Sequence, residues 1–172
     1  MTEIIPTWLG GDLVAVDSID VHRQGLRHRA VSVFVMCRGA LLVQRRSQTK
    51  AHTPGLWSSS CCSHLRWNED PQACALRHLQ LELQLTPSVP LRSCAQIEYR
   101  ADVGRGMIDH EVVDVFVADM TEKPGITCNP DLVLEAAWRA VPALCLDIAR
   151  EPEQYTPWLR LCLSDHRSLI FD

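Results

Sequence analysis

The sequence predicts an α+β protein, an α/β sandwich in which strand pairs surround a central helix and more helices follow near the end of the chain. Three observations predict this class. Residues 31–37, "VSVFVMC", form an apolar run rich in β-branched side chains, which is typical of a buried strand. Residues 68–85 space their leucines as one face of a helix, and two segments late in the chain have helical patterns.

The first half of the chain is expected to form a hairpin and a further strand. After residues 31–37, the turn "RGA" leads into "LLVQRR", residues 41–46. Pro54 and Gly55 mark a turn before "LWSSSCCSH", residues 56–64. Because side chains alternate along a strand, Cys62 and His64 are expected on one face and Cys61 on the other.

The central helix is predicted within residues 68–85. We expect Asn68 to cap it, Glu69 and Asp70 to lie in its first turn, and Pro87 to stop it. Pro71 suits the first helical position. The core stripe of this helix consists of Leu76, Leu79 and Leu83. His78 and Glu82 are four residues apart and are therefore expected to share a face.

Two strands and two helices complete the expected order. Residues 93–101 and 110–120 have strand-like patterns, and Asp109 and Glu111 are expected on one face with His110 turned away. Residues 141–150 and 156–166 are expected to be helices, the second with Thr156 as cap and Pro157 in its first turn. The first twenty residues are assigned no element, since they suit either an edge strand or a cover over a pocket.

Composition is consistent with one compact domain over residues 1–172. The chain is 47% hydrophobic and 22% charged, which is enough to bury a core without disulfides. Its eight cysteines are scattered and form no pair of C-x-x-C clips. Most of them are therefore expected to be buried as small hydrophobic residues.

Charge and hydropathy bear on location and partners. The formal net charge is −4 and the isoelectric point is about 5.9, with no run of Lys or Arg, so nucleic acid is a poor candidate partner. No signal peptide pattern and no apolar window of about 20 residues are present. We therefore expect a cytoplasmic protein that acts on a small molecule, without membrane binding, as a monomer or homodimer.

Three histidines and two carboxylates form a candidate metal site. His22 and His28 precede the first long strand and His64 follows the double cysteine, while Asp109 and Glu111 lie on a later strand. Such a nitrogen and oxygen set suits Zn²⁺, Mn²⁺ or Mg²⁺. Spacing alone leaves the alternative open, because a scattered histidine is more often a surface residue or a hydrogen-bonded core group.

Three longer motifs identify a family. The run "GLRHRAVSVFVM" (25–36), the run "RRSQTKAHTPGLWSSSCCSH" (45–64) and "YTPWLR" (155–160) together resemble type 1 isopentenyl-diphosphate isomerases, from about His22 to Arg160. That family belongs to the Nudix superfamily, so the resemblance implies a Nudix-like mixed sheet packed between helices. It also implies interconversion of isopentenyl and dimethylallyl diphosphate through a tertiary carbocation.

The resemblance implies a role for each matching residue. Cys62 corresponds to the catalytic thiol and Glu111 to the acid/base. Tyr99 resembles the hydroxyl that supports this acid/base, and Trp158 the aromatic ring that faces the cation. The implied metal ligands are His22, His28, His64, Asp109 and Glu111.

The diphosphate end of the substrate has its own implied residues. Glu82 resembles the carboxylate that helps to bind a second ion, Mg²⁺, against the diphosphate. Arg46 and Lys50 match basic residues that bind the diphosphate. His78 stands where an arginine often reaches it, and Asp109 stands where a longer glutamate is frequent. We expect His78 to weaken substrate binding or to make it pH-sensitive, and Asp109 to shift the position of the metal or to weaken its binding.

Departures from the Nudix helix signature bear on the reaction. The signature places Gly, Glu, Arg-Glu, a Glu pair and Gly at the positions held here by Ser63, Glu69, Arg77-His78, Leu81-Glu82 and Gln84. The missing carboxylates disfavour a Nudix-type diphosphohydrolase, which remains the second reading of the sequence. The third is a non-catalytic, metal-binding relative, which has no need of both Cys62 and Glu111.

Overall fold

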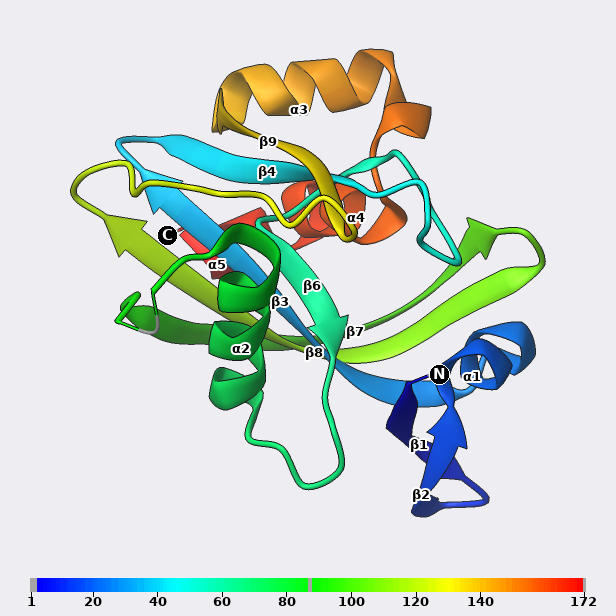
Figure 1. Cartoon of the computed structure of the whole chain (residues 1–172). Coiled ribbons are helices and arrows are strands. Elements are labelled where there is room, and N and C mark those ends of the chain that lie inside the picture. The colour runs from blue at the N-terminus through cyan, green and yellow to red at the C-terminus, as the bar shows by residue number, and fades with distance from the viewer. Residues whose placement is uncertain (1–2, 87, 172) are drawn as a thin grey trace.

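The computed structural model describes residues 3–86 and 88–171, which form one mixed sheet with helices on both faces (Figure 1). This arrangement confirms the predicted α+β class. The strands are β1 (Ile4–Leu9), β2 (Asp12–Asp17), β3 (Arg27–Cys37), β4 (Ala40–Arg46), β5 (Trp57–Ser58), β6 (Cys61–His64), β7 (Leu91–Gly104), β8 (Met107–Met120) and β9 (Val133–Ala140). The helices are α1 (Ser18–Gln24), α2 (Pro71–Leu83), α3 (Val141–Arg150), α4 (Pro157–Asp165) and α5 (Arg167–Phe171), with a 3₁₀ turn at Pro152–Gln154.

Strand β3 is the centre of the sheet. It pairs in parallel with β8 along its whole length, from Arg27–His110 to Cys37–Met120. Its other edge pairs in sequence with β1, β6 and the start of β4, all antiparallel. Strands β7 and β8 form a long antiparallel hairpin, and β4 pairs with β9 and β5. As a result, β1, β6 and β8 all lie next to the same central strand.

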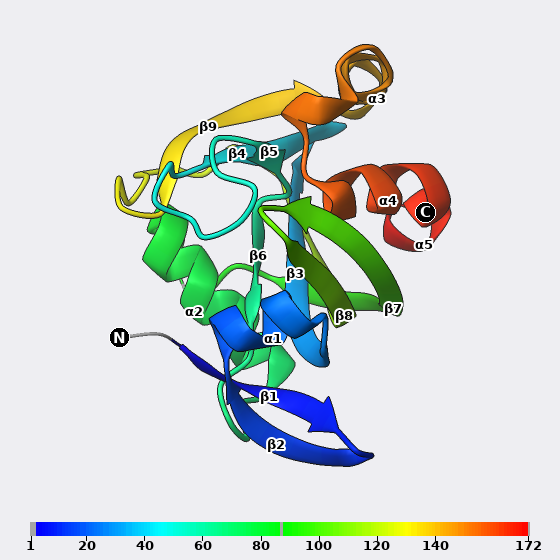
Figure 2. The same cartoon turned by 90° about the vertical axis from the view of Figure 1, so that its right-hand side faces the viewer.

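Alternation along β3 separates two cores. Val31, Val33 and Val35 pack toward α2, whereas Ala30 and Phe34 pack toward the face that carries α4 and α5. Figure 2 shows the two layers edge-on, with α2 on one side of the sheet and α4 and α5 on the other. Every second residue of β3 and β8 therefore faces the α4 side.

The predicted strand at 56–64 is two strands. β5 and β6 are separated by the buried Ser59 and Ser60. The Ser60 hydroxyl donates to the Leu42 carbonyl at 2.6 Å and accepts from the Val35 amide at 2.8 Å. Because these hydroxyls satisfy buried backbone groups, the chain can leave β4 through β5 and cross to β3 through β6. The predicted hairpin between β3 and β4 is confirmed, although these strands pair at only two positions.

The start of the central helix differs from the prediction. Asp70, not Asn68, is the N-cap, since its side chain accepts from the Ala73 amide at 3.0 Å. Glu69 also lies before the helix and binds Arg77 with two hydrogen bonds of 2.6 and 2.7 Å. The helix ends at Gln84, whose φ of 53° is in the left-handed region. Pro87, expected to stop the helix, lies outside the described residues.

Two segments went beyond the prediction. Strand β9 was not expected, and it forms the outer edge beyond β4. The N-terminal segment is a β1–β2 hairpin followed by α1, whose N-cap is Asp17. The expected helices at 141–150 and 156–166 are confirmed, but Thr156 caps α4 without a side-chain hydrogen bond.

Candidate active site

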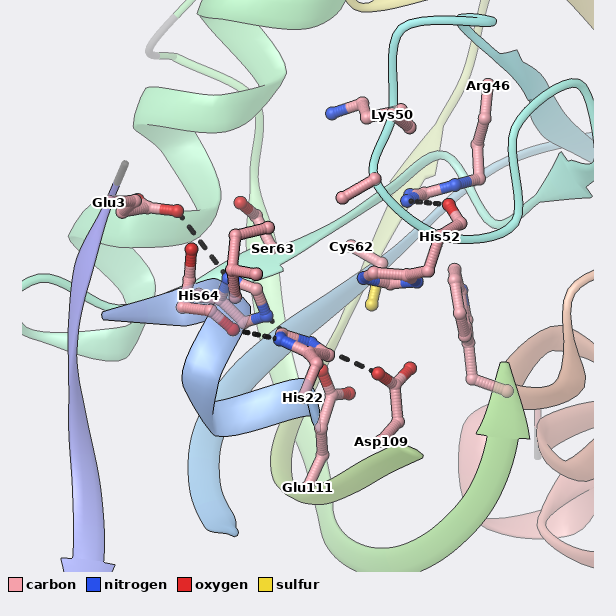
Figure 3. A pocket seen from close by; sticks show the side chains of 14 residues that line it. Glu3, His22, Arg46, Lys50, His52, Cys62, Ser63, His64, Asp109 and Glu111 are labelled. Atoms are coloured by element: carbon pink, nitrogen blue, oxygen red, sulfur yellow. Dashed lines mark hydrogen bonds and ion pairs between the residues drawn. The ribbon is translucent and has the colours of Figure 1, made fainter. Parts of the chain in front are cut away.

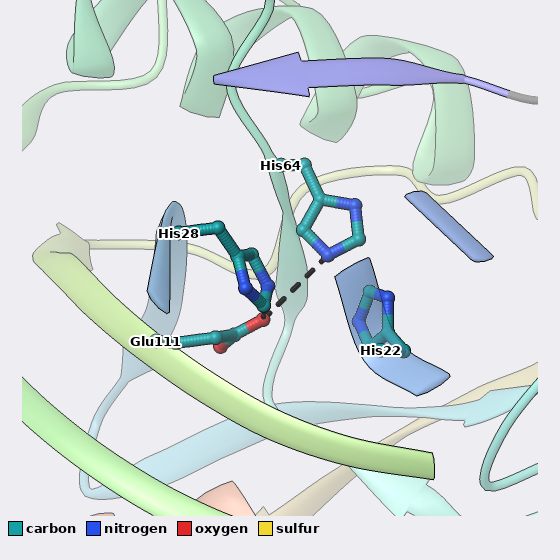
Figure 4. Close-up of side chains that lie close together, drawn as sticks. All are labelled: His22, His28, His64 and Glu111. Carbon is teal, nitrogen blue, oxygen red and sulfur yellow. Dashed lines mark ion pairs between the residues drawn. The ribbon is translucent and has the colours of Figure 1, made fainter. Parts of the chain in front are cut away.

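Three imidazoles and a carboxylate converge beside the central strand (Figure 4). His22 comes from α1, His28 from β3, His64 from β6 and Glu111 from β8. Their potential ligand atoms all lie within 4.8 Å of one another. His28 is adjacent to Glu111 in the β3–β8 ladder, and Ala30 is paired with His64 in the β3–β6 ladder. Strand pairing therefore brings together residues that are up to 83 positions apart in the sequence.

Backbone carbonyls fix the orientation of two of the imidazoles. Nδ1 of His22 donates to the Ser18 carbonyl at 2.5 Å, and Nδ1 of His28 donates to the Leu26 carbonyl at 2.8 Å. Since a carbonyl can only accept, Nδ1 carries a proton in each ring, and Nε2 is the ring nitrogen directed at the cluster. This is the arrangement in which a metal-ligating histidine is held by its second shell.

Buried acceptors in this cluster face one another without partners. Nε2 of His22 is 3.1 Å from Oδ1 of Asp109, but neither atom has a hydrogen bond among the described residues, and neither has Nε2 of His28. His22, His28 and Asp109 are at most 2% exposed. Burying unpaired acceptors costs about 1–3 kcal/mol each unless a proton or cation satisfies them. The donor set therefore fits a divalent metal ion.

Glu111 is the most connected group of the cluster. Its Oε1 is 3.4 Å from Nε2 of His28 and 3.6 Å from Nε2 of His64, and its Oε2 accepts from the Tyr99 hydroxyl at 2.5 Å. Burial acts to raise the pKa of Glu111, but the two imidazoles outweigh it and hold that pKa well below its ordinary value. The same carboxylate and burial raise the pKa of Tyr99, which keeps this hydroxyl protonated.

Asp109 belongs to a second, adjacent group. It lies two residues before Glu111 on the same face of β8, as predicted, while His110 turns outward to Glu98. Its potential ligand atom clusters with those of His22 and His52, not with the group around Glu111. Burial, followed by the charge of Glu111, raises the pKa of Asp109.

A cavity of about 220 Å³ opens above these groups (Figure 3). This volume is below the roughly 300–1,000 Å³ of sites for drug-sized ligands and suits a small substrate. It is lined by the residue before β1, by α1, the end of β4, the loop 47–56, β6, β8 and α4. The lining residues are Glu3, Ser18, Ile19, His22, Arg46, Lys50, Ala51, His52, Cys62, Ser63, His64, Asp109, Glu111 and Trp158.

The two adjacent cysteines face opposite sides of the sheet, as predicted. Cys61 is fully buried in the core under α2, whereas Cys62 lines the cavity and packs against the α4 side. Burial, and then the charge of Glu111, raise the pKa of Cys62 well above its ordinary value. The cavity therefore contains a neutral thiol that can donate a proton.

Arg46, Lys50 and Trp158 line the same cavity. Arg46 is 7% exposed, and its guanidinium carbon is 5.1 Å from the centre of the Trp158 ring. The indole nitrogen of Trp158 donates to the Ser58 hydroxyl at 2.8 Å, which fixes the plane of the ring. Two cationic side chains and an aromatic ring thus line one cavity.

Glu82 and His78 lie on the other face of the sheet. Both are on α2, do not line the cavity, and pair with each other through Nδ1 of His78 and Oε1 of Glu82 at 3.3 Å. Oε2 of Glu82 accepts from Nε2 of Gln44 at 2.6 Å. Burial acts to raise the pKa of Glu82, but the His78 hydrogen bond and the charge of Lys50 lower it overall. The positive charge of Lys50, which lines the cavity, therefore acts on Glu82 although Glu82 does not line the cavity itself.

Sequence reasoning missed His52 and Glu3. The ring of His52 stacks on His22 with a centroid separation of 4.6 Å, and Oε2 of Glu3 is 3.5 Å from Nδ1 of His64. His52 is two residues after Lys50 within the motif that identifies the family, so that position gave a usable signal. Nothing local marks Glu3, because the β1–β2 hairpin alone brings it to the site.

Comparisons with known proteins agree with this geometry. Residues 26–160 match the NUDIX domain family. The chain is 47% identical over 171 residues to a protein named isopentenyl-diphosphate Delta-isomerase from Roseobacter denitrificans, covering 99% of this chain and 97% of that one. Proteins of the same name from Dinoroseobacter shibae and Cereibacter sphaeroides are each 46% identical, with 99% of this chain covered and 97% and 96% of theirs.

The chain belongs to the Nudix-type isopentenyl-diphosphate Delta-isomerase family.

Solved structures support the fold of this family member. A Deinococcus radiodurans crystal structure aligns with a TM-score of 0.74 at 16% identity, covering 94% of this chain and 97% of that one. The Escherichia coli dihydroneopterin triphosphate pyrophosphohydrolase aligns with a TM-score of 0.59 at 15% identity, covering 78% and 91%. At these identities the likeness concerns the Nudix fold alone. Among the described residues, no helix is long and apolar enough to span a membrane.

Proposed function

We propose that this chain is an isopentenyl-diphosphate Delta-isomerase, which interconverts isopentenyl and dimethylallyl diphosphate. The single observation that carries this assignment is the convergence of Cys62 and Glu111, from two different strands, on a cavity that also contains a metal-binding donor set. The near full-length identity of 47% to a protein of that name supports the same reaction. The substrate is a small prenyl diphosphate.

Cys62 and Glu111 carry the proton transfers in this proposal. Moving the double bond requires a proton to add to the terminal methylene carbon and another to leave the neighbouring methylene group. The raised pKa of Cys62 and the depressed pKa of Glu111 supply one proton donor and one proton acceptor in the same cavity. The Tyr99 hydroxyl, hydrogen-bonded to Glu111 at 2.5 Å, orients the carboxylate and can relay its proton.

Trp158 stabilises the positive charge that forms between the two transfers. Its ring lines the cavity and is 3% exposed. An aromatic face attracts a cation electrostatically, with a gain of about 0.5–2 kcal/mol, and has no lone pair that would trap the cation. Because the ring is fixed by Ser58, it needs no reorientation when the charge develops.

Arg46 and Lys50 bind the diphosphate at the wall of the cavity that they form. Both are cationic groups that the substrate's negative charges can pair with. Glu82, which lies outside the cavity but in the field of Lys50, would help to hold the Mg²⁺ that accompanies the diphosphate. His78 is hydrogen-bonded to Glu82 and would approach the diphosphate from the same side, with fewer donors than an arginine offers.

His22, His28, His64, Asp109 and Glu111 are the residues that hold the other divalent ion, Zn²⁺, Mn²⁺ or Mg²⁺. When bound, this ion supplies positive charge that lowers the proton affinity of Glu111 and fixes its orientation. The unpaired acceptors at His22, His28 and Asp109 support this role. Nδ1 protonation at His22 and His28 leaves both rings ready to coordinate through Nε2.

Isomerisation in D₂O tests the proposal. Purified protein with Mg²⁺ and isopentenyl diphosphate is followed by proton NMR, and we expect dimethylallyl diphosphate that carries deuterium. Cys62→Ala and Glu111→Gln are each expected to lower the rate by at least 100-fold, the scale of general acid–base catalysis. Cys145→Ala, at a cysteine on α3 outside the cavity, is the matched control and is expected to leave the rate within twofold.

The same spectra separate the competing reactions. Release of phosphate or pyrophosphate without a double-bond shift would instead establish a Nudix-type hydrolase. An unchanged substrate with Mg²⁺, Mn²⁺ and Zn²⁺ all supplied would support a non-catalytic, metal-binding relative. An isomerase that keeps full activity as Cys62→Ala would remove the thiol from the mechanism.

A further inference from the structure

We propose that His52 is a further ligand of the divalent ion and forms a cation position with His22 and Asp109. The potential ligand atoms of these three residues lie within 4.8 Å of one another, beside the cluster of His22, His28, His64 and Glu111. The inference rests on the proposed metal centre, but it concerns a donor that the resemblance to the isomerases does not include. With His52 included, the donor set consists of the group formed by His22, His28, His64 and Glu111, with the imidazole of His52 and the carboxylate of Asp109 beside it.

The geometry of the rings supports coordination by His52. The centroids of His22, His28 and His64 are separated by 5.0–5.2 Å, and His52 lies 4.6 Å from His22, so it belongs to the same array of rings. Figure 3 shows His52 above His22 and Asp109 on the inner wall of the cavity. The side chain of His52 therefore lies where a further metal ligand, supplied by the loop 47–56, would complete the group of His22 and Asp109.

The loop that carries His52 is held at three successive carbonyls. Arg46 donates to the carbonyls of His52 and Thr53, each at 3.2 Å, and Arg105 donates to that of Ala51 at 3.3 Å. A ligand on a flexible loop pays an ordering cost when the ion binds, but this backbone is already fixed on both sides of His52. Arg46 thus holds the backbone that positions the imidazole of His52, in addition to lining the cavity.

Asp109 gives the physical reason why an extra donor is needed. Its oxygen reaches His22 but does not group with His28, His64 and Glu111, as its side chain is one methylene shorter than glutamate. The unpaired Oδ1 of Asp109 and Nε2 of His22 point at each other and need a cation or a proton between them. His52 is the third donor available at that place. We infer that it compensates for the short carboxylate.

His22 joins the two groups and limits how they are filled. Its Nδ1 is occupied by the Ser18 carbonyl, so only the Nε2 lone pair is free to coordinate. One lone pair serves one ion at a time. The structure therefore predicts one bound ion, not two ions side by side. Coordination by Asp109 and His52 would place this ion off the centre of the three-histidine cluster, toward these two residues.

Metal binding without substrate tests this inference. Protein stripped with a chelator is titrated with Co²⁺, and the visible spectrum and the affinity in chelator competition are recorded for the wild type and His52→Phe. Phenylalanine keeps an aromatic ring against His22 and Trp158 but has no donor atom. We expect a stoichiometry of one, at least tenfold weaker binding in His52→Phe, and a changed absorption band. His110→Ala is the control, because His110 lies on β8 and faces away from the site.

A second pair of variants tests the compensation. Asp109→Glu in the His52→Phe background is expected to recover most of the lost affinity, because the longer carboxylate can reach the three-histidine group. In the Zn²⁺-loaded wild type, the imidazole ¹⁵N signals of His52 are expected to move to the position of a metal-bound nitrogen.

The outcomes separate this inference from the proposed function. Unchanged Co²⁺ affinity and spectrum in His52→Phe, or unmoved ¹⁵N signals, would show that His52 is a wall of the cavity only. Failure of Asp109→Glu to restore binding would overturn the compensation. Because these measurements use no substrate, a protein that binds Co²⁺ through His52 but does not isomerise would refute the proposed function alone.

Discussion

Removing the Tyr99 hydroxyl tests how Glu111 is held for its role. The hydroxyl is buried with Tyr99, which is 9% exposed, and it donates to Oε2 of Glu111 at 2.5 Å. Tyr99→Phe deletes one oxygen and keeps the ring in the core. Since the remaining contacts of Glu111 go to its other oxygen, Oε1, the loss leaves Oε2 without the donor that orients it.

The expected magnitude follows from the charge of the acceptor. A hydrogen bond to a charged group contributes about 1.5–3 kcal/mol. If that energy is realised in the transition state, kcat falls by about tenfold to 150-fold, at roughly 1.36 kcal/mol per factor of ten. We expect the change in kcat and not in KM, because Tyr99 does not line the cavity.

The assay is the initial rate of deuterium-labelled dimethylallyl diphosphate formation, measured over a range of substrate concentrations. Tyr155→Phe is the matched control, since Tyr155 is the other tyrosine of the chain and lines pockets away from the metal cluster. It is expected to change kcat by less than twofold. If Tyr99→Phe also stays within twofold of the wild type, the hydroxyl does not orient Glu111 and the reasoning fails.

Two further predictions concern stability. Gln84 is the C-cap of α2 and has a φ of 53°, a conformation that costs a non-glycine residue about 1 kcal/mol. Gln84→Gly is therefore expected to raise the free energy of unfolding, measured by urea titration, by about 0.5–1 kcal/mol. Gln80→Gly, inside the helix, is the control and is expected to lower the free energy of unfolding by about 1 kcal/mol. In metal-free protein, hydrogen bonds to Glu111 and Glu3 outweigh burial and raise the pKa of His64 to about 9. A raised pKa contributes stability that is fully present below about pH 6.5 and is lost as the pH rises through about 9. In the wild type, the free energy of unfolding is therefore expected to fall between these two pH values, and in His64→Gln this fall is expected to be smaller. An unchanged slope in His64→Gln would contradict the prediction.

Much of the fold and the direction of the site residues could be predicted from local pattern. Alternation alone placed Cys61 and Cys62 on opposite faces, and it placed Asp109 and Glu111 together with His110 outside. Helical spacing predicted that His78 and Glu82 share a face of the helix, and in the structure they lie 3.3 Å apart. The strength of these predictions is that they depend only on the geometry of one strand or one helix.

Boundaries set by competing polar groups were less predictable. Asn68 and Asp70 are both good N-caps, and Asp70 is the one used because the chain before it is tied by Glu69 to Arg77. The break between β5 and β6 depends on Ser60, whose hydroxyl bonds to two other strands. In both cases the deciding partner lies outside the local motif, since Arg77 is eight residues from Glu69 and the partners of Ser60 are 18 and 25 residues away.

The sequence by itself determined the family, the type of most elements and which neighbouring side chains of one strand or helix share a face, because these depend on short motifs and on periods of two and 3.6 residues. Only the tertiary structure decided which faces meet. Pairing of β6 and β8 to β3 gathers the histidines around Glu111, and backbone carbonyls choose the tautomers of His22 and His28. The loop fixed by Arg46 brings His52 to the cavity, whereas Glu82, on α2, does not line it. Such contacts join residues far apart along the chain, so no local pattern records them.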